Sequence, residues 1–68
     1  MKLHELGLSK SQILYLIDEW IWNTRNKEML ILKLEGLTYE EIAEKYCLSV
    51  QYTKEIILAS QNRILKHL

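Results

Sequence analysis

The side chains best suited to chemistry lie in a short stretch that follows Ser49. Gln51 carries the amide group that pairs with adenine in the major groove of DNA, and Lys54 can bind a base or a phosphate. The Tyr52 hydroxyl can reach a phosphate, or the ring can simply cover the stem of Lys54. Because no arginine stands here to bind guanine, base recognition would depend on Gln51 and Lys54.

Two further cations, Arg63 and Lys66, can contact phosphates if the helix that carries them lies along a duplex. The alternative is that both lie in solvent and interact with the negative end of that helix. We include Arg63 and Lys66 among the predicted DNA contacts. The predicted DNA-binding residues are Ser49, Val50, Gln51, Tyr52, Lys54, Glu55, Arg63 and Lys66.

Residues that could serve catalysis or metal binding are poorly placed for either. The stretch 40–44 holds three glutamates, but no nucleophile accompanies them, and we interpret them as a solvated helix face. Cys47 is the only cysteine, which excludes an internal disulfide and fits a reducing setting. His4 and His67 have no partner ligands at metal-binding spacing. We expect no enzyme, no metal site and no cofactor.

The bulk composition indicates one small helical domain. The chain has 68 residues, 49% of them hydrophobic, with no proline and two glycines. Nine basic and nine acidic side chains balance, which weakens the simplest argument for nucleic-acid binding, although positive charge predominates from Lys45 onward. No apolar run approaches the ~18 residues of a membrane span, and the first residues do not resemble a signal peptide. We expect a cytoplasmic protein without membrane contact.

Capping signals define the first two helices. Ser9 and Gln12 have the spacing of a capping box, which opens a helix expected to end near Asn23. Asn26 is expected to cap a second helix, which Gly36 closes. The apolar residues predicted to share the buried face of the first helix are Ile13, Leu16, Ile17, Trp20 and Ile21.

Similar signals define two more helices. Thr38 and Glu41 form a capping box for a short helix through about Tyr46, and Ser49 caps a last helix that can run to the end of the chain. On that helix, the Thr53 hydroxyl can bond back to a helix carbonyl. The predicted buried face consists of Val50, Thr53, Ile56, Ile57, Ser60 and Ile64.

Residues 39–58 meet the demands of a helix-turn-helix. Such a motif needs a short first helix, a small residue at the close approach, a tight turn and a capped second helix. Ala43 is the small residue, and Ser49 begins the recognition helix. The positions that must be apolar for the two helices to pack are Ile42, Tyr46, Leu48 and Ile56.

The run EGLTYEEIAE at 35–44, followed by LSV at 48–50, resembles the fourth region of sigma factors and its relatives, including small phage-encoded activators of late transcription. The resemblance implies upstream support helices, an extended recognition helix and sequence-specific DNA binding in transcription. Cys47 departs from the pattern because glycine usually stands in that turn, which suggests either a different turn or a strained one.

The fold prediction is therefore an all-α, four-helix domain over residues 1–68. Support helices occupy about 9–35 and the helix-turn-helix about 38–58, with a recognition helix that can continue to 68. The function prediction is a DNA-binding transcriptional regulator. The alternatives are a protein-interaction module that binds RNA polymerase or a host defence protein, and a purely structural homodimer.

Apolar residues outside the predicted core indicate a homodimer or another protein partner. Tyr15 and Trp22 are predicted to share an exposed face of the first helix. The alternative is that the N-terminal leucines Leu3, Leu6 and Leu8 fold back and cover one such pair. The predicted interface residues are Tyr15, Trp22, Leu58 and Leu65.

Overall fold

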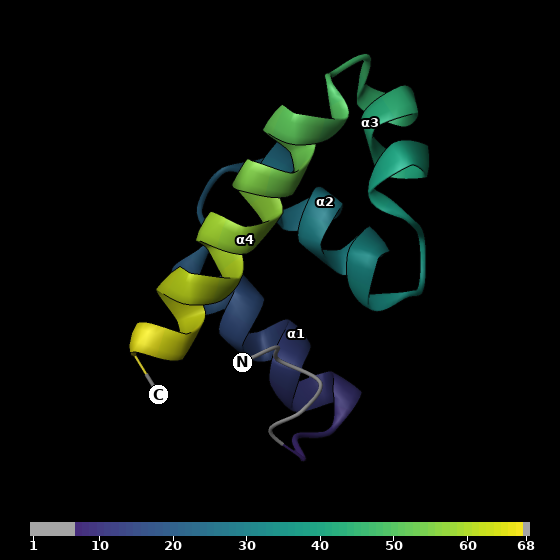
Figure 1. The fold of residues 1–68 in the computed structure, drawn as a ribbon. Helices are drawn as coiled ribbons and strands as arrows, with labels where there is room; N and C mark the ends of the chain where they lie inside the picture. Colours follow the sequence, from purple (N-terminus) through teal and green to yellow (C-terminus); the bar gives the residue numbers. More distant parts are fainter. Residues whose placement is uncertain (1–6, 68) are drawn as a thin grey trace.

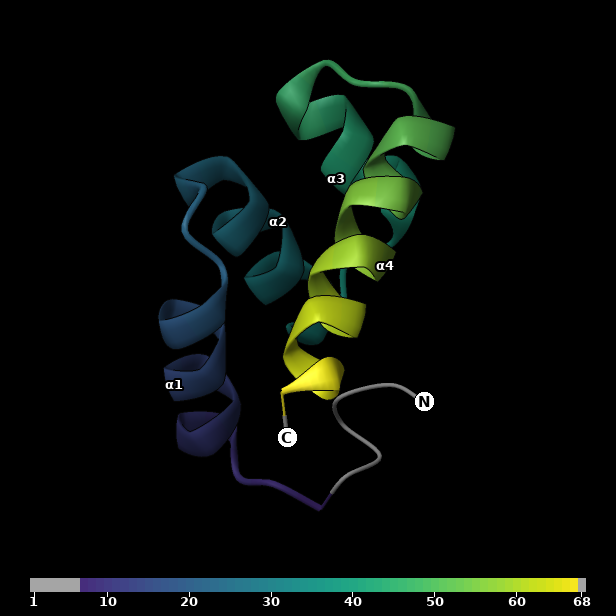
Figure 2. The same ribbon diagram turned by 90° about the vertical axis from the view of Figure 1, so that its left-hand side faces the viewer.

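The computed structural model describes residues 7–67, which form four helices and, over that range, no strand. The helices are α1 (Lys10–Trp20), α2 (Thr24–Leu34), α3 (Tyr39–Tyr46) and α4 (Val50–Lys66). The longest, α4, packs against each of the other three (Figure 1). A view from the side places α1 and α2 along one side of α4 and α3 beside its start (Figure 2). The predicted all-α, four-helix fold class is confirmed.

The core forms where the apolar faces of the helices meet α4. Each helix contributes a side chain with at most 1% exposure, such as Ile17 from α1, Leu30 from α2 and Ile42 from α3. Burying one such side chain stabilises the fold by about 1.5–3 kcal/mol. The buried apolar residues are Ile13, Ile17, Ile21, Met29, Leu30, Ile42, Ala43, Ile56, Ile57 and Ile64.

Polar side chains cap all four helix starts. The Ser9 and Thr38 capping boxes form as predicted, and the Ser49 hydroxyl accepts a hydrogen bond from a backbone N–H of α4. The prediction for α2 was wrong, because Asn23 rather than Asn26 is the cap. The Asn23 side chain accepts a hydrogen bond from the Asn26 N–H at 3.1 Å, so α2 begins earlier and Asn26 lies in its first turn. Correspondingly, α1 ends at Trp20 and not near Asn23.

Gly36 ends α2 as predicted, in the left-handed region with φ +106°. Its N–H donates to the Lys33 carbonyl at 3.1 Å, and the Leu37 N–H donates to the Leu32 carbonyl at 3.2 Å. This pair of bonds is the Schellman motif, which satisfies carbonyls that the end of a helix leaves free.

The end of α3 has the same pair of hydrogen bonds without a glycine. Cys47 adopts φ 56° and ψ 41°, and its N–H donates to the Glu44 carbonyl at 3.3 Å. The next N–H, from Leu48, donates to the Ala43 carbonyl at 2.9 Å. Of the two possibilities considered for Cys47, the strained left-handed conformation is the one observed.

The far end of α4 contacts the end of α1. The His67 ring stacks on the Trp20 ring with 3.9 Å between centroids and 3° between planes. Leu65 is half-buried against the core. At the other end of the chain, Leu8 also packs against the core, whereas Leu3, Leu6 and the proposed final position 68 lie outside the described residues.

Candidate functional site

The unit formed by α3, its following turn and the start of α4 is held together by apolar contacts. Ile42 is 0% exposed and Ala43 2%, and Tyr46 and Leu48 are half-buried against the core. The Tyr46 hydroxyl also donates to a Glu28 carboxylate oxygen at 2.9 Å, which ties α3 to α2. Burial, helped by this hydrogen bond, raises the pKa of Tyr46 above its usual value. The unit therefore presents the start of α4 from a supported position.

The first turns of α4 expose the predicted contact residues Gln51, Tyr52, Lys54 and Glu55. The Gln51 Nε2 group donates to a Glu55 carboxylate oxygen at 3.2 Å. Val50 is 41% exposed, so its placement on the buried face was wrong. It is the first residue of α4, and the buried face begins only at Thr53.

Thr53 is completely buried and its hydroxyl finds no hydrogen-bond partner among the described residues. The bond back to a helix carbonyl that a threonine can make does not form here. Ser60, about two turns further along, does make such a bond, to the Ile56 carbonyl at 2.9 Å. An unpaired buried hydroxyl opposes folding by about 1–3 kcal/mol.

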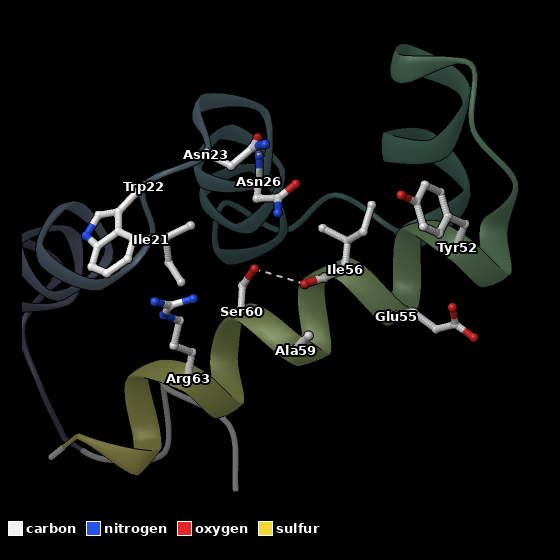
Figure 3. A pocket seen from close by; sticks show the side chains of 10 residues that line it. All are labelled: Ile21, Trp22, Asn23, Asn26, Tyr52, Glu55, Ile56, Ala59, Ser60 and Arg63. Carbon is white, nitrogen blue, oxygen red and sulfur yellow. Dashed lines mark hydrogen bonds between the residues drawn. The ribbon is translucent and has the colours of Figure 1, made fainter.

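A groove of about 500 Å³ runs along α4 on the side of α1 and α2 (Figure 3). Exposed aromatic rings stand toward its two ends, Trp22 at one and Tyr52 at the other. The groove is lined by Ile21, Trp22, Asn23, Asn26, Tyr52, Glu55, Ile56, Ala59, Ser60 and Arg63.

Each of these aromatic rings has a guanidinium above it. The Arg63 guanidinium carbon lies 4.5 Å from the centre of the Trp22 ring, and that of Arg25 lies 5.9 Å from the centre of the Tyr52 ring. Both distances are within the range of a cation–π interaction. Arg25 could not be predicted from the sequence, because its position in the first turn of α2 gives no sign that it meets α4.

Two lysines lie near a third ring, that of Tyr39, on the other side of α4. Lys33 lies 4.3 Å and Lys54 6.0 Å from the centre of the Tyr39 ring. Lys66, by contrast, is exposed in the last turn of α4. The structure thus brings Lys54 close to α3 and Arg63 close to the connection between α1 and α2, on different sides of one helix.

The predicted partner interface is only partly exposed. Tyr15, Trp22 and Leu58 are 67%, 71% and 38% exposed, whereas the expected exposure of Leu65 was wrong because this side chain packs against the core. Trp22 follows the end of α1, so it does not share a helix face with Tyr15 as expected. Its indole N–H donates to the Glu19 carbonyl at 3.1 Å, which fixes the ring beside the groove.

The described part of the chain gives little support for a membrane span or a metal site. No helix within residues 7–67 is long and apolar enough to cross a membrane. In the same range, no three histidine, cysteine or acidic side chains gather where they could hold a metal ion, and His4 lies outside it. A scan of protein-family models and searches of the curated proteins and the solved structures found no match to this chain.

Proposed function

We propose that residues 38–58 form a helix-turn-helix and that the protein is a sequence-specific DNA-binding regulator of transcription, as its resemblance to the fourth region of sigma factors implies. One observation carries the proposal: a short capped helix and a tight left-handed turn support the capped, exposed start of a longer helix. Burial of Ala43 lets the two helices approach closely.

The hydrogen bond between Gln51 and Glu55 suits Gln51 to adenine. One hydrogen of the Gln51 amide is directed to the carboxylate, while its second hydrogen and its oxygen are available. Adenine presents one acceptor and one donor at its major-groove edge, which matches that pair. Glu55 therefore positions Gln51 as well as being a predicted contact itself.

Lys54 serves the same surface as a point charge. Its ammonium group lies at the outer limit of contact with the Tyr39 ring, 6.0 Å from the centre, and can swing to a base or a phosphate. Because the chain as a whole carries no net charge, we expect modest affinity for non-specific DNA and a shallow dependence on salt.

The first experiment measures binding of the full chain to a fluorescent random-sequence duplex by anisotropy, at roughly 50 and 200 mM salt. We expect binding at the lower concentration that weakens at the higher one. An absence of binding at low salt, with a helical circular dichroism spectrum, would contradict the proposal. Selection of duplexes from a random pool then identifies a preferred sequence.

Variants test the predicted contacts on the selected duplex. Gln51→Ala and Lys54→Ala should each weaken binding by about 1–3 kcal/mol and relax the preference at one base pair. Lys10→Ala is the matched control, since Lys10 is exposed at the start of α1. All three variants should keep the wild-type circular dichroism. Unchanged affinity of both α4 variants would remove these residues from the interface.

A second candidate function is association with a protein, either another copy of this chain or a protein such as RNA polymerase. The exposure of Trp22 and Tyr15, at 71% and 67%, favours it, because large aromatic residues are enriched at protein interfaces. A two-fold dimer would present two recognition helices to half-sites about 34 Å apart. Light scattering of the wild type and of Trp22→Ala tests self-association: a monomeric wild type rules out the dimer.

A further inference from the structure

The two sides of α4 differ in charge. Of the three cations on α2, Arg25 lies over Tyr52 beside the groove, whereas Lys33 lies over Tyr39. Lys27 pairs with Asp18 of α1 at 2.8 Å. On the other side of α4, α3 carries one cation and three carboxylates. A helix in the major groove has a phosphate strand on each side. The strand beside the more cationic side of the protein is attracted more strongly than the other strand. The approach of DNA to α4 is therefore expected to be asymmetric, with the closer strand on the side of α2.

The groove beside α4 has the shape and direction for that strand. Tyr52 and Arg63 are eleven positions apart on α4, which is close to three full turns and about 16 Å along the axis. Both side chains consequently leave the helix on the same side, at opposite ends of the groove. Arg63 and Arg25, which lies over Tyr52, are thus separated enough to meet different phosphates.

Polar groups between the two arginines suit a phosphate backbone. The Asn23 side-chain oxygen accepts from the Asn26 N–H, and the Asn26 side-chain oxygen accepts from Arg25 Nε at 3.4 Å. With their oxygens engaged in this way, both side chains retain amide N–H groups that can donate to phosphate oxygens. The Trp22 ring packs on one face of the Arg63 guanidinium and leaves its in-plane N–H groups for bidentate contact. Arg25, at the outer limit of contact with Tyr52, keeps its terminal N–H groups for the same purpose.

Glu55 is the one carboxylate among the described residues that line the groove. Its side chain points away from α2, whereas those of Ile56, Ser60 and Arg63 point toward the α1–α2 side (Figure 3). Its carboxylate also accepts the hydrogen bond from Gln51. The carboxylate is thus directed to the face of α4 that carries Gln51, while Ile56 and Ser60 line the groove beside it.

We propose that this groove binds one sugar-phosphate strand of the duplex whose major groove receives α4, with Arg25 and Arg63 contacting separate phosphates. The inference rests on the proposed function, and it adds Arg25 and the asparagines to the surface. It also fixes which side of α4 lies closer to the DNA backbone.

The test measures salt dependence with the full chain and the random-sequence duplex. Each neutralised phosphate contributes about −0.9 to the slope of log affinity against log salt. Arg25→Gln and Arg63→Gln should each make the slope shallower by about 0.9, and the double variant by about twice that. Lys10→Gln, which removes the same charge from α1, should leave the slope at the wild-type value.

One further variant and the oligomeric state of the variants keep this test decisive. Arg63→Lys retains the charge and should keep the wild-type slope, which separates charge loss from loss of packing on Trp22. If Arg25→Gln and Arg63→Gln bind with wild-type slopes while the wild type binds DNA, the groove proposal is overturned and the proposed function stands. If the same variants instead dissociate a wild-type dimer, the groove belongs to a second copy. If the wild type binds no duplex, both proposals fail.

Discussion

The connection between α2 and α3 and the connection between α3 and α4 close their helices with the same two backbone hydrogen bonds, but with residues of different conformational cost. Gly36 enters the left-handed region without a steric penalty, whereas Cys47 has a Cβ atom that costs roughly 1 kcal/mol or more there. The two turns share the same pair of hydrogen bonds, although Gly36 lies at φ +106° and Cys47 at φ 56°, so it is the presence of a Cβ atom that sets the steric cost.

The helix start after the Gly36 turn is also better capped than the helix start after the Cys47 turn. Thr38 and Glu41 satisfy each other's backbone N–H groups, and the backbone hydrogen bond from Thr38 holds the pKa of the Glu41 carboxyl below its usual value. Ser49 has no such reciprocal partner, because the third residue of α4 is Tyr52, which lacks a carboxylate or amide. Thr53 then adds a buried unpaired hydroxyl.

The less favourable connection is thus the one beside the proposed DNA-binding surface. Local conflicts between residue type and structure are typical of functional sites, where a side chain is suited to a partner rather than to the fold. Tyr52 illustrates this point: an acid there would complete a capping box, but it would place a negative charge beside Arg25 and the proposed phosphate path.

The largest expected effect comes from damaging the favourable connection. Gly36→Ala should reduce the free energy of unfolding by about 1–2 kcal/mol, because φ +106° is strained for any residue with a Cβ atom. No atom lies within 4 Å of the added Cβ, so the effect isolates backbone conformation from steric contact. Urea unfolding measures it, with Glu35→Ala as the control in a right-handed conformation. Equal losses of unfolding free energy in Gly36→Ala and Glu35→Ala would show that the left-handed conformation of Gly36 carries no special cost for a Cβ atom.

A smaller effect of opposite sign is expected from Thr53→Val. Valine keeps the shape of threonine and removes the unpaired hydroxyl, so the free energy of unfolding should rise by about 1 kcal/mol. The control is Ser60→Ala, which removes a hydroxyl that does have a partner and should instead lower stability by about 0.5–1.5 kcal/mol. A loss of stability in Thr53→Val would show that the hydroxyl is satisfied in solution.

The smallest effect is expected from Cys47→Gly. Relief of the left-handed strain favours folding, but the greater freedom of unfolded glycine offsets part of it, leaving a gain of about 0.5 kcal/mol. Cys47→Ala retains the Cβ atom and should match the wild type in the same urea titration. If the glycine variant is less stable than the alanine variant, Cys47 is not strained and the two turns are equivalent.

The parts of the fold that could be predicted from sequence are those with local causes. Ser9, Thr38 and Ser49 each meet a backbone N–H three residues away, so three helix starts follow from short spacings. Asn23 and Asn26 both fit a cap, and only the path of the chain after Trp20 decides between them. The apolar period continues through Ile21, which is buried although α1 has ended, and this extended the predicted helix too far.

The candidate site could be predicted only in its helical half. Exposure of Gln51 and Lys54 follows from the helical period of α4, whereas the groove depends on how α2 crosses that helix. Arg25 is far from Tyr52 in sequence, and Trp22 is far from Arg63. No local sequence pattern predicts that these pairs of side chains meet. Leu65 was misplaced for the same reason, since only the packing of the helices shows that its side chain is covered.

The packing of α4 against all three other helices also constrains how the chain folds during synthesis. The apolar faces of α1, α2 and α3 have no complete core until residues 50–66 have left the ribosome. At roughly 5–20 residues per second, translation of the 17 residues of α4 adds about 1–3 s before the core can be completed. During that interval Ile17, Leu30 and Ile42 lack their main partner, so folding of the nascent chain should await the emergence of α4.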